Sequence, residues 1–236
     1  VVIALTYTHV AAEEIRDRID GLGVDTAQLW VGTIHSFCLT WILRPYGIYH
    51  EALLEGFSVI DSHDREAILD EIAKRNGMRG GHHDCKYYAT EDGYSLDKHI
   101  APNLIRPLER TIEEYHERLL GRRQIDFEMM LKFAHDLIAE HEPIAKRLGQ
   151  IFKIIAIDEY QDTNHAQYRF VKLLASKYQQ ITVVGDPDQS IYGWRGADIR
   201  NILHFEQDYP QSGVIKMEQN YRSSSTILEA ANALIQ

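Results

Sequence analysis

Two adjacent acids that follow an apolar run are the residues in this sequence best placed for metal-assisted chemistry. Ile154–Ile157 is short, apolar and rich in β-branched residues, and Asp158 and Glu159 come directly after it. In enzymes that transfer phosphoryl groups, an acid in this position supports Mg²⁺ and a neighbouring acid can orient the attacking water. Surface turns often carry two such acids, so the pair alone leaves a structural and a catalytic interpretation open.

Four further apolar runs end in polar or aromatic clusters in the same way. The runs are Val1–Leu5, Leu29–Val31, Ile181–Val184 and Val214–Met217. The clusters that follow them are Thr6–Thr8, Gly32–Ser36, Gly185–Ser190 and Glu218–Arg222. Ligands of open α/β sheets bind at the carboxyl ends of the strands. Five such clusters therefore predict a single working surface along one edge of a sheet.

The rest of the pattern predicts the elements that would position these clusters. Continuously apolar runs are typical of strands buried on both faces of a parallel sheet, and helical periodicity follows most of them. Alternating strands and helices predict an α/β fold. The stretch 46–125 differs, because helical patterns at Arg65–Lys74 and Leu108–Leu120 dominate it. Within that stretch, Gly80–Tyr94 is rich in glycine, histidine and tyrosine and is predicted to be an irregular connection.

The order of the polar clusters resembles a known series of motifs. Thr6–Thr8, Gly32–Ser36, Asp158–Asp162, the long run Gly185–Ala197 and Gln219–Ser223 look like motifs Ia, Ib, II, III and IV of superfamily 1 DNA helicases of the UvrD/Rep type. The resemblance is strong for residues 1–45 and 150–236 and thinner between them. It implies a RecA-like parallel sheet with flanking helices, of the P-loop NTPase type, that carries a mainly helical inserted subdomain.

The resemblance also implies a division of the chain. Residues 1–45 and 126–236 would form subdomain 1A, and residues 46–125 would be a helical insertion similar to subdomain 1B. Ile125–Glu128 resembles the family segment that re-enters subdomain 1A, although Met129 and Met130 replace acids that are usual there.

Roles in nucleotide hydrolysis follow from the resemblance, with ATP and Mg²⁺ as the implied cofactors. Asp158 would help to hold Mg²⁺ and Glu159 would be the general base. Gln189 and Arg222 would contact the γ-phosphate, and Tyr221 would stack on the adenine. These residue types suit the reaction, because the transferring phosphoryl group needs a metal and a guanidinium and the water needs an acceptor. Structural alternatives remain: Gln161 and Asp162 could cap the next helix, Tyr221 could be packed, and Arg222 could form an ion pair.

Single-stranded DNA and its junctions with duplex DNA are the implied substrates. The DNA surface would comprise Tyr7, Thr33, His35, Tyr192, Trp194 and Arg195. Aromatic rings that stack on bases tolerate any sequence, which suits a motor and reconciles DNA binding with a net charge of -10. His9 and Val10 stand where the family usually has asparagine and lysine, so an amide and a cation are lost near the expected DNA path.

Composition narrows the remaining possibilities. The sequence has no apolar run near the ~20 residues that span a bilayer and no signal peptide, so no membrane partner is predicted. Two cysteines, Cys38 and Cys85, are too few for a disulfide framework and favour a reducing cytoplasm. His82 and His83 next to Cys85 do not make a zinc site, because adjacent histidines rarely bind one metal.

The phosphate-binding loop of such motors is not found in the sequence. No Gly-x-x-x-x-Gly-Lys-Ser/Thr run occurs, and both ends of the chain look like cuts through regular elements. We therefore expect a fragment of an ATP-dependent DNA helicase or translocase that works with a second motor domain and is inactive alone. Two alternatives remain open: the motor part of a helicase-nuclease, and a non-catalytic single-strand-binding module derived from a helicase.

Overall fold

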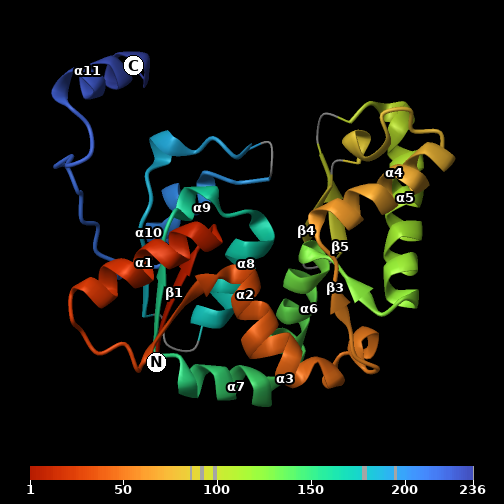
Figure 1. Cartoon of the computed structure of the whole chain (residues 1–236), viewed down its shortest axis with the longest axis horizontal. Coiled ribbons are helices and arrows are strands. Elements are labelled where there is room, and N and C mark those ends of the chain that lie inside the picture. Colours follow the sequence, from red (N-terminus) through yellow and green to blue (C-terminus); the bar gives the residue numbers. More distant parts are fainter. Residues whose placement is uncertain (86, 91–92, 98–99, 177–179, 194–195, 236) are drawn as a thin grey trace.

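Four of the predicted strands form one parallel sheet. The computed structural model describes every residue except 86, 91–92, 98–99, 177–179, 194–195 and 236. The strands run in the order β2–β1–β7–β8 (Figure 1), with bounds of Val2–Thr6 for β1, Leu29–Thr33 for β2, Ile154–Ile157 for β7 and Ile181–Val183 for β8. All three pairings are parallel, and Val2 lies opposite both Leu29 and Ile154. The prediction of an α/β fold with a parallel sheet and flanking helices is confirmed.

The prediction of a fifth strand at Val214–Met217 is wrong. This segment lies outside the described strands, and Ile215 and Met217 are 89% and 85% exposed. A strand is stable only where a neighbouring strand satisfies its backbone N–H and C=O groups. Among the described strands, none pairs with this segment, so its apolar pattern alone does not produce a strand.

Helices connect the strands and pack around them. Thr8 begins α1 by accepting a hydrogen bond from the backbone N–H of Ala11 at 3.1 Å, as expected for an N-cap. In the sheet region the helices are α1 His9–Gly21, α2 Ile34–Phe37, α3 Arg44–Tyr46, α6 Phe127–Glu140, α7 Glu142–Ile151, α8 His165–Ala175, α9 Arg200–Leu203 and α10 Phe205–Asp208. A π-helical segment, Cys38–Leu43, joins α2 to α3. The last helix, α11 Ser225–Ile235, projects from the rest of the molecule (Figure 1). None of the described helices is both long and apolar enough to cross a membrane.

The region between α3 and α6 contains two long helices and two small sheets. The helices are α4 Ser62–Arg75 and α5 Pro102–Gly121, as the helical patterns predicted. The strands β3 Ser58–Val59 and β6 Gln124–Ile125 pair in parallel, so the chain enters and leaves this region side by side (Figure 1).

The predicted irregular connection at Gly80–Tyr94 is largely wrong. A short helical turn at Gly81–Asp84 is followed by an antiparallel hairpin of β4 Tyr87–Thr90 and β5 Gly93–Leu96. The rings of Tyr87 and Tyr94 lie 6.0 Å apart, and each also contacts the His116 ring on α5. Cross-strand aromatic contacts and packing on a helix therefore stabilise a hairpin that local composition does not predict.

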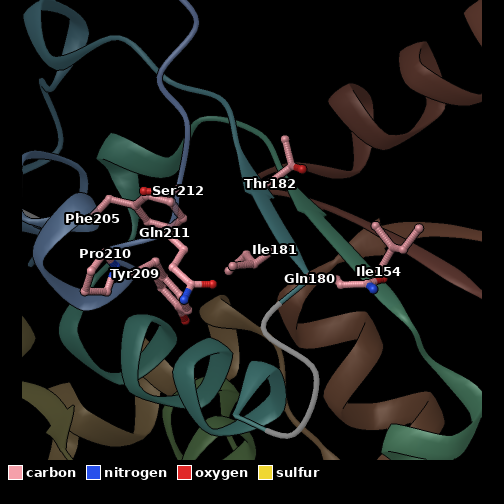
Figure 2. A pocket seen from close by; sticks show the side chains of 9 residues that line it. All are labelled: Ile154, Gln180, Ile181, Thr182, Phe205, Tyr209, Pro210, Gln211 and Ser212. Carbon is pink, nitrogen blue, oxygen red and sulfur yellow. The ribbon is translucent and has the colours of Figure 1, made fainter.

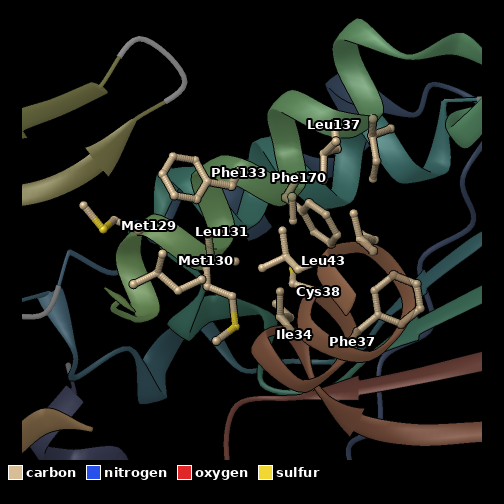
Figure 3. Close-up of a cluster of buried hydrophobic side chains, with 14 of the residues drawn as sticks. Ile34, Phe37, Cys38, Leu43, Met129, Met130, Leu131, Phe133, Leu137 and Phe170 are labelled. Carbon is tan, nitrogen blue, oxygen red and sulfur yellow. The ribbon is translucent and has the colours of Figure 1, made fainter. Parts of the chain in front are cut away.

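The central helix α6 joins the inserted region to the sheet through one hydrophobic core. Its side chains pack with residues of α2, the π-helical segment and α8 (Figure 3); the cluster includes Ile34, Phe37, Cys38, Leu43, Met130, Leu131, Leu137 and Phe170. Met129 and Met130 are 5% and 1% exposed. The two methionines that replace the usual acids are therefore core residues, which accounts for their apolar character here.

A buried carboxylate fixes the start of α6. Asp126 is 0% exposed, and its Oδ1 accepts from the backbone N–H of Met129 at 2.9 Å as the helix N-cap. Its Oδ2 accepts from Tyr115 Oη on α5 at 2.8 Å and lies 3.4 Å from Arg65 Nε on α4. Three elements thus converge on one charge, which compensates for the cost of burying it.

Replacing Tyr115 with phenylalanine should test this cluster. Tyr115→Phe removes only the hydroxyl that donates to the buried carboxylate, and a hydrogen bond to a charged group contributes about 1.5–3 kcal/mol. We expect the unfolding free energy, measured by urea titration, to fall by that amount. Tyr49→Phe is the control, because Tyr49 is 58% exposed. An equal effect in both variants would contradict the proposed role of the buried hydroxyl.

Candidate nucleotide and DNA site

The carboxyl ends of β1, β7 and β8 meet at one edge of the sheet. The backbone N–H of Asp158, directly after β7, donates to the Leu5 carbonyl of β1 at 2.9 Å. Two residues later, the backbone N–H of Tyr160 donates to the Val184 carbonyl after β8 at 3.0 Å. The acidic cluster thus lies between the ends of its two neighbouring strands. This is the position at which open α/β sheets bind ligands.

The two acids after β7 differ in environment and backbone geometry. Asp158 is half-buried, its Oδ1 accepts from the backbone N–H of Glu159 at 3.0 Å, and burial raises its pKa, with the charges of Glu159 and Glu14 adding to the effect. Glu159 is exposed and adopts a left-handed backbone conformation with φ of 54°. A non-glycine residue in this region costs about 1–3 kcal/mol, and such strain is concentrated at functional sites.

Asp158 suits a magnesium ion that is held mainly by other ligands. Mg²⁺ keeps several waters and binds through one or two carboxylates together with substrate phosphates, rather than in an all-protein cage. Within the described ranges, no group of three or more acidic, histidine or cysteine side chains could hold a metal by itself. The half-buried carboxylate whose pKa is raised by burial and nearby negative charge would gain from a cation beside it. The residues present therefore fit a metal bound as a nucleotide complex.

The residues after the acidic pair do not cap the following helix. Asn164 is the N-cap of α8, where it forms a reciprocal capping box with Gln167, so the structural alternative of a cap at Gln161 or Asp162 is excluded. Asp162 is buried, and its Oδ1 has no hydrogen-bond partner within the described structure. Burial, followed by the charge of Glu159, raises its pKa.

A buried glutamine that was not among the predicted site residues connects the two loops. Gln161 Nε2 donates to Glu159 Oε2 at 2.8 Å, and its Oε1 accepts from the backbone N–H of Asp186 at 3.1 Å. Gln189 is exposed, and its Nε2 donates to Asp186 Oδ2 at 2.7 Å. The structure therefore brings Glu159 and Gln189 into one hydrogen-bonded group. The polar residues at the two strand ends were visible in the sequence, but their connection was not.

Two of the predicted DNA-contacting rings stack on each other. The rings of Tyr7, after β1, and Tyr192, in the loop after β8, lie 5.7 Å apart with an interplanar angle of 23°. Both side chains are half-buried. Trp194 and Arg195 lie outside the described residues. An aromatic surface thus begins at the same sheet edge as the acidic pair.

Thr33 and His35 occupy more enclosed positions. Thr33 is buried, and its Oγ1 accepts from the backbone N–H of Ser36 at 3.1 Å as the N-cap of α2. The His35 ring packs edge-on against Phe127 at 5.4 Å. Burial lowers the pKa of His35 to about 4, with Asp126 opposing and His9 reinforcing the shift. At neutral pH this imidazole is therefore uncharged and could contact DNA only by hydrogen bonding or stacking.

The lowered pKa of His35 predicts acid sensitivity. In the unfolded chain the His35 imidazole binds a proton at pH values below about 6.5, whereas in the folded chain it does so only near pH 4. The contribution of His35 to the unfolding free energy is therefore fully present above pH 6.5 and is lost as the pH falls toward 4. Between pH 7 and pH 4.5, His35→Gln should lose about 2 kcal/mol less unfolding free energy than the wild type, as measured by urea unfolding. His63→Gln, an exposed change on α4, should retain the wild-type dependence. A His35→Gln curve that is parallel to the wild-type curve would contradict the shift.

Tyr221 and Arg222 lie in an exposed turn that precedes α11. Tyr221 is 92% exposed and Arg222 is exposed. Their segment forms a turn in which Asn220 Oδ1 accepts from the backbone N–H groups of Arg222 at 2.9 Å and Ser223 at 2.8 Å. No hydrogen bond or ion pair joins the Arg222 side chain to another described residue. The structure does not bring these two residues into the group formed by Asp158, Glu159 and Gln189.

A separate groove of about 620 Å³ lies at the other end of the strands. It is lined by the starts of β7 and β8 and by residues after α10 (Figure 2), including Ile154, Gln180, Ile181, Tyr209 and Pro210. Because ligands of open α/β sheets bind at the carboxyl ends of strands, this groove is not the expected nucleotide site.

Comparison with known proteins agrees with this arrangement. The UvrD/REP helicase N-terminal domain family matches residues 1–210. The ATP-dependent DNA helicase PcrA of Staphylococcus aureus is 38% identical over 250 residues, covering 99% of this chain and 33% of that protein. PcrA of Staphylococcus epidermidis is 35% identical over 249 residues with the same coverage. The chain thus spans 33% of the length of these curated relatives. With its parallel sheet and its motifs at the carboxyl edge, the chain belongs to the UvrD/Rep helicase family.

Proposed function

We propose that this segment is part of an ATP-dependent DNA helicase or translocase, in which hydrolysis drives movement on single-stranded DNA and unwinding at junctions with duplex DNA. The main support is that one sheet edge carries both the acidic pair after β7 and the stacked rings of Tyr7 and Tyr192. A hydrolytic group and an aromatic DNA surface on the same strand ends suit a motor that couples the two.

The acidic pair would serve the nucleotide. The magnesium complex of ATP supplies the transferable phosphoryl group and the charge that the site must stabilise. Asp158 would hold the metal through its half-buried carboxylate. Glu159, exposed and held by Gln161, would accept a proton from water. Gln189 would contact the γ-phosphate and couple its presence or absence to the DNA surface, because Gln189 and Tyr192 lie in the same loop after β8. Tyr221 and Arg222 would reach the nucleotide through movement of the segment that precedes α11.

The proposed motor contains more than this segment. Subdomain 1A would comprise residues 1–45 and 126–236, with residues 46–125 as the inserted subdomain 1B, and a second motor domain would close on the nucleotide. The side-by-side pairing of β3 with β6 supports such an insertion. A cytoplasmic location is part of the proposal, and it is supported by the two free, buried cysteines, Cys38 and Cys85.

Removal of one of the stacked rings tests the DNA surface. In the full-length protein, Tyr7→Ala should weaken binding to mixed-sequence single-stranded DNA by about 1–3 kcal/mol, because a base stack is lost and no base edge is read. Fluorescence anisotropy with a labelled oligonucleotide measures the effect. Tyr49→Ala, a loss of an exposed ring elsewhere, should leave the affinity unchanged. Equal affinities for Tyr7→Ala and wild type would show that the Tyr7 ring does not contact DNA.

A further inference from the structure

Gln161 uses both ends of its side-chain amide inside the protein. It is 1% exposed, donates from Nε2 to Glu159 Oε2 at 2.8 Å and accepts at Oε1 from the backbone N–H of Asp186 at 3.1 Å. The partners dictate this orientation, since a carboxylate can only accept and a backbone N–H can only donate. One buried side chain therefore connects the proposed base to the loop after β8.

The connection continues through Asp186 to the tip of the loop. The Asp186 carboxylate accepts from the backbone N–H of Asp188 at 3.0 Å and from Gln189 Nε2 at 2.7 Å. A series of hydrogen bonds thus runs from Glu159 through Gln161 and Asp186 to Gln189. Movement of the loop after β8 would shift the Gln161 amide, and this amide donates the hydrogen bond that holds the Glu159 carboxylate.

The sequence leaves space for this close approach. A Cβ atom at Gly185 would lie 2.5 Å from Gln161 Oε1 and 3.2 Å from the backbone nitrogen of Tyr160. Any side chain at this position would displace the Gln161 amide or the backbone after β7. Glycine at position 185 is therefore required for the packing of the two loops, as is typical where backbones approach closely.

A second attachment holds the chain beyond this loop, at the start of α9. Thr163, two residues after Gln161, accepts at its carbonyl from the backbone N–H of Asp198 at 3.1 Å and from Asn201 Nδ2 at 2.9 Å. Between the two attachments the loop carries Tyr192, which stacks on Tyr7. Contact with Tyr192 therefore acts on a segment that is attached on both sides of this ring. One of the two attachments is the side chain of Gln161, which also holds Glu159.

We propose that Gln161 is a positioning residue that orients the Glu159 carboxylate according to the position of the 185–192 loop, so that DNA contact at Tyr192 sets the rate of hydrolysis. The inference rests on the proposed function and adds to it a residue through which DNA stimulates turnover. Gln161 itself touches neither reactant. It acts by holding the base in an orientation that the exposed, strained backbone at Glu159 does not fix by itself.

A pair of buried glutamines gives a matched test in the full-length protein. Gln161→Met keeps the volume and removes both hydrogen bonds, whereas Gln167→Met makes the same change in the capping box of α8, at 4% exposure. The ratio of DNA-stimulated to basal ATP turnover should fall about 10- to 100-fold in Gln161→Met, the effect of one lost hydrogen bond to a charged group. Affinities for ATP and DNA should stay near wild type. Gln167→Met should lower thermal stability and keep the stimulation ratio.

The hydrogen bond itself can be observed without turnover. Hydrogen–deuterium exchange should show the Asp186 amide to be protected in the wild type and in Gln167→Met, because it donates to a buried oxygen in both. In Gln161→Met this amide should exchange faster. Unchanged protection would mean that the amide does not depend on Gln161, which would overturn the inference.

A charge at the same position gives a signature that a packing role would not produce. Gln161→Glu places a second carboxylate where the amide now lies, 2.8 Å from Glu159 Oε2. Two carboxylates at this distance cannot both ionise freely, so the pair binds a proton at higher pH. The acid limb of the pH–rate profile should therefore move to higher pH. A profile that coincides with the wild-type profile would contradict contact between the two side chains.

The outcomes separate this inference from the function on which it rests. A wild-type protein without DNA-stimulated turnover would overturn the proposed function and the inference with it. A stimulated wild type together with a fully stimulated Gln161→Met would overturn the inference alone. Equal losses of basal and stimulated turnover in both glutamine variants would also overturn it, because they would show a general structural effect.

Discussion

Glu159→Gln in the full-length protein should abolish most ATP turnover while leaving nucleotide binding nearly intact. The change keeps the size of the side chain and an oxygen that can accept from Gln161 Nε2, so the local geometry should persist. It removes the negative charge that would accept a proton from water. General-base catalysis typically contributes about 10²–10⁴-fold, and we expect a loss of that size in single-turnover hydrolysis. Because Asp158 is unchanged, magnesium-dependent nucleotide affinity should change little.

The matched control for this experiment is a surface acid away from the sheet edge. Glu206 on α10 is exposed, and Glu206→Gln makes the same chemical change there. Its turnover should equal that of the wild type. If Glu159→Gln hydrolyses ATP at a similar rate, the acid after β7 is a structural residue and the proposed mechanism loses its base.

Arg222→Ala should reduce turnover by an even larger factor. An arginine that stabilises charge on the transferring phosphoryl group contributes about 10³–10⁵ in rate, and it also contacts the nucleotide before reaction. We therefore expect a loss of that size in single-turnover hydrolysis, together with weaker discrimination between ATP and ADP. This second effect should distinguish Arg222→Ala from Glu159→Gln, which leaves binding almost unchanged.

Because Arg222 is exposed, this prediction requires its segment to move toward the nucleotide. The turn set by Asn220 holds its backbone, and the guanidinium would have to reach the nucleotide by movement of the 218–224 segment. Arg222→Lys should remain defective, because a lysine keeps the charge without the planar fork that binds phosphate oxygens. Arg147→Ala, at an exposed position on α7, is the control. Wild-type turnover in Arg222→Ala would show that Arg222 is a surface residue of the turn and has no role in hydrolysis.

The sequence by itself determined the strands of the sheet and the polar clusters that follow them. The runs at Val1–Leu5, Leu29–Val31, Ile154–Ile157 and Ile181–Val184 are short, mainly apolar and rich in β-branched residues, and this local signal needs no knowledge of the fold. The long match from Gly185 to Ala197 identified the family for the same reason, since its residues are adjacent in the chain.

Local patterns failed where a partner decides the structure. Val214–Met217 has the composition of a strand and remains unpaired, whereas Gly80–Tyr94 has the composition of a loop and contributes most of a hairpin. The deciding factor in the first case is the lack of a neighbouring strand among the described residues. In the second case it is the His116 ring, which packs against both strands from α5.

Only the tertiary structure decided how the site is connected. Tyr7 meets Tyr192 because the strand order places β1 and β8 on either side of β7, and the spacing of residues along the chain does not encode that order. The hydrogen bond from the backbone N–H of Asp186 to Gln161 Oε1 also arises there, since it depends on the close approach of the loop at Gly185. The position of Gln161 inside the run Asp158–Asp162 does not show what its side chain does. It becomes a candidate for positioning the base only because the two ends of its amide bond to the loop after β7 and to the loop after β8.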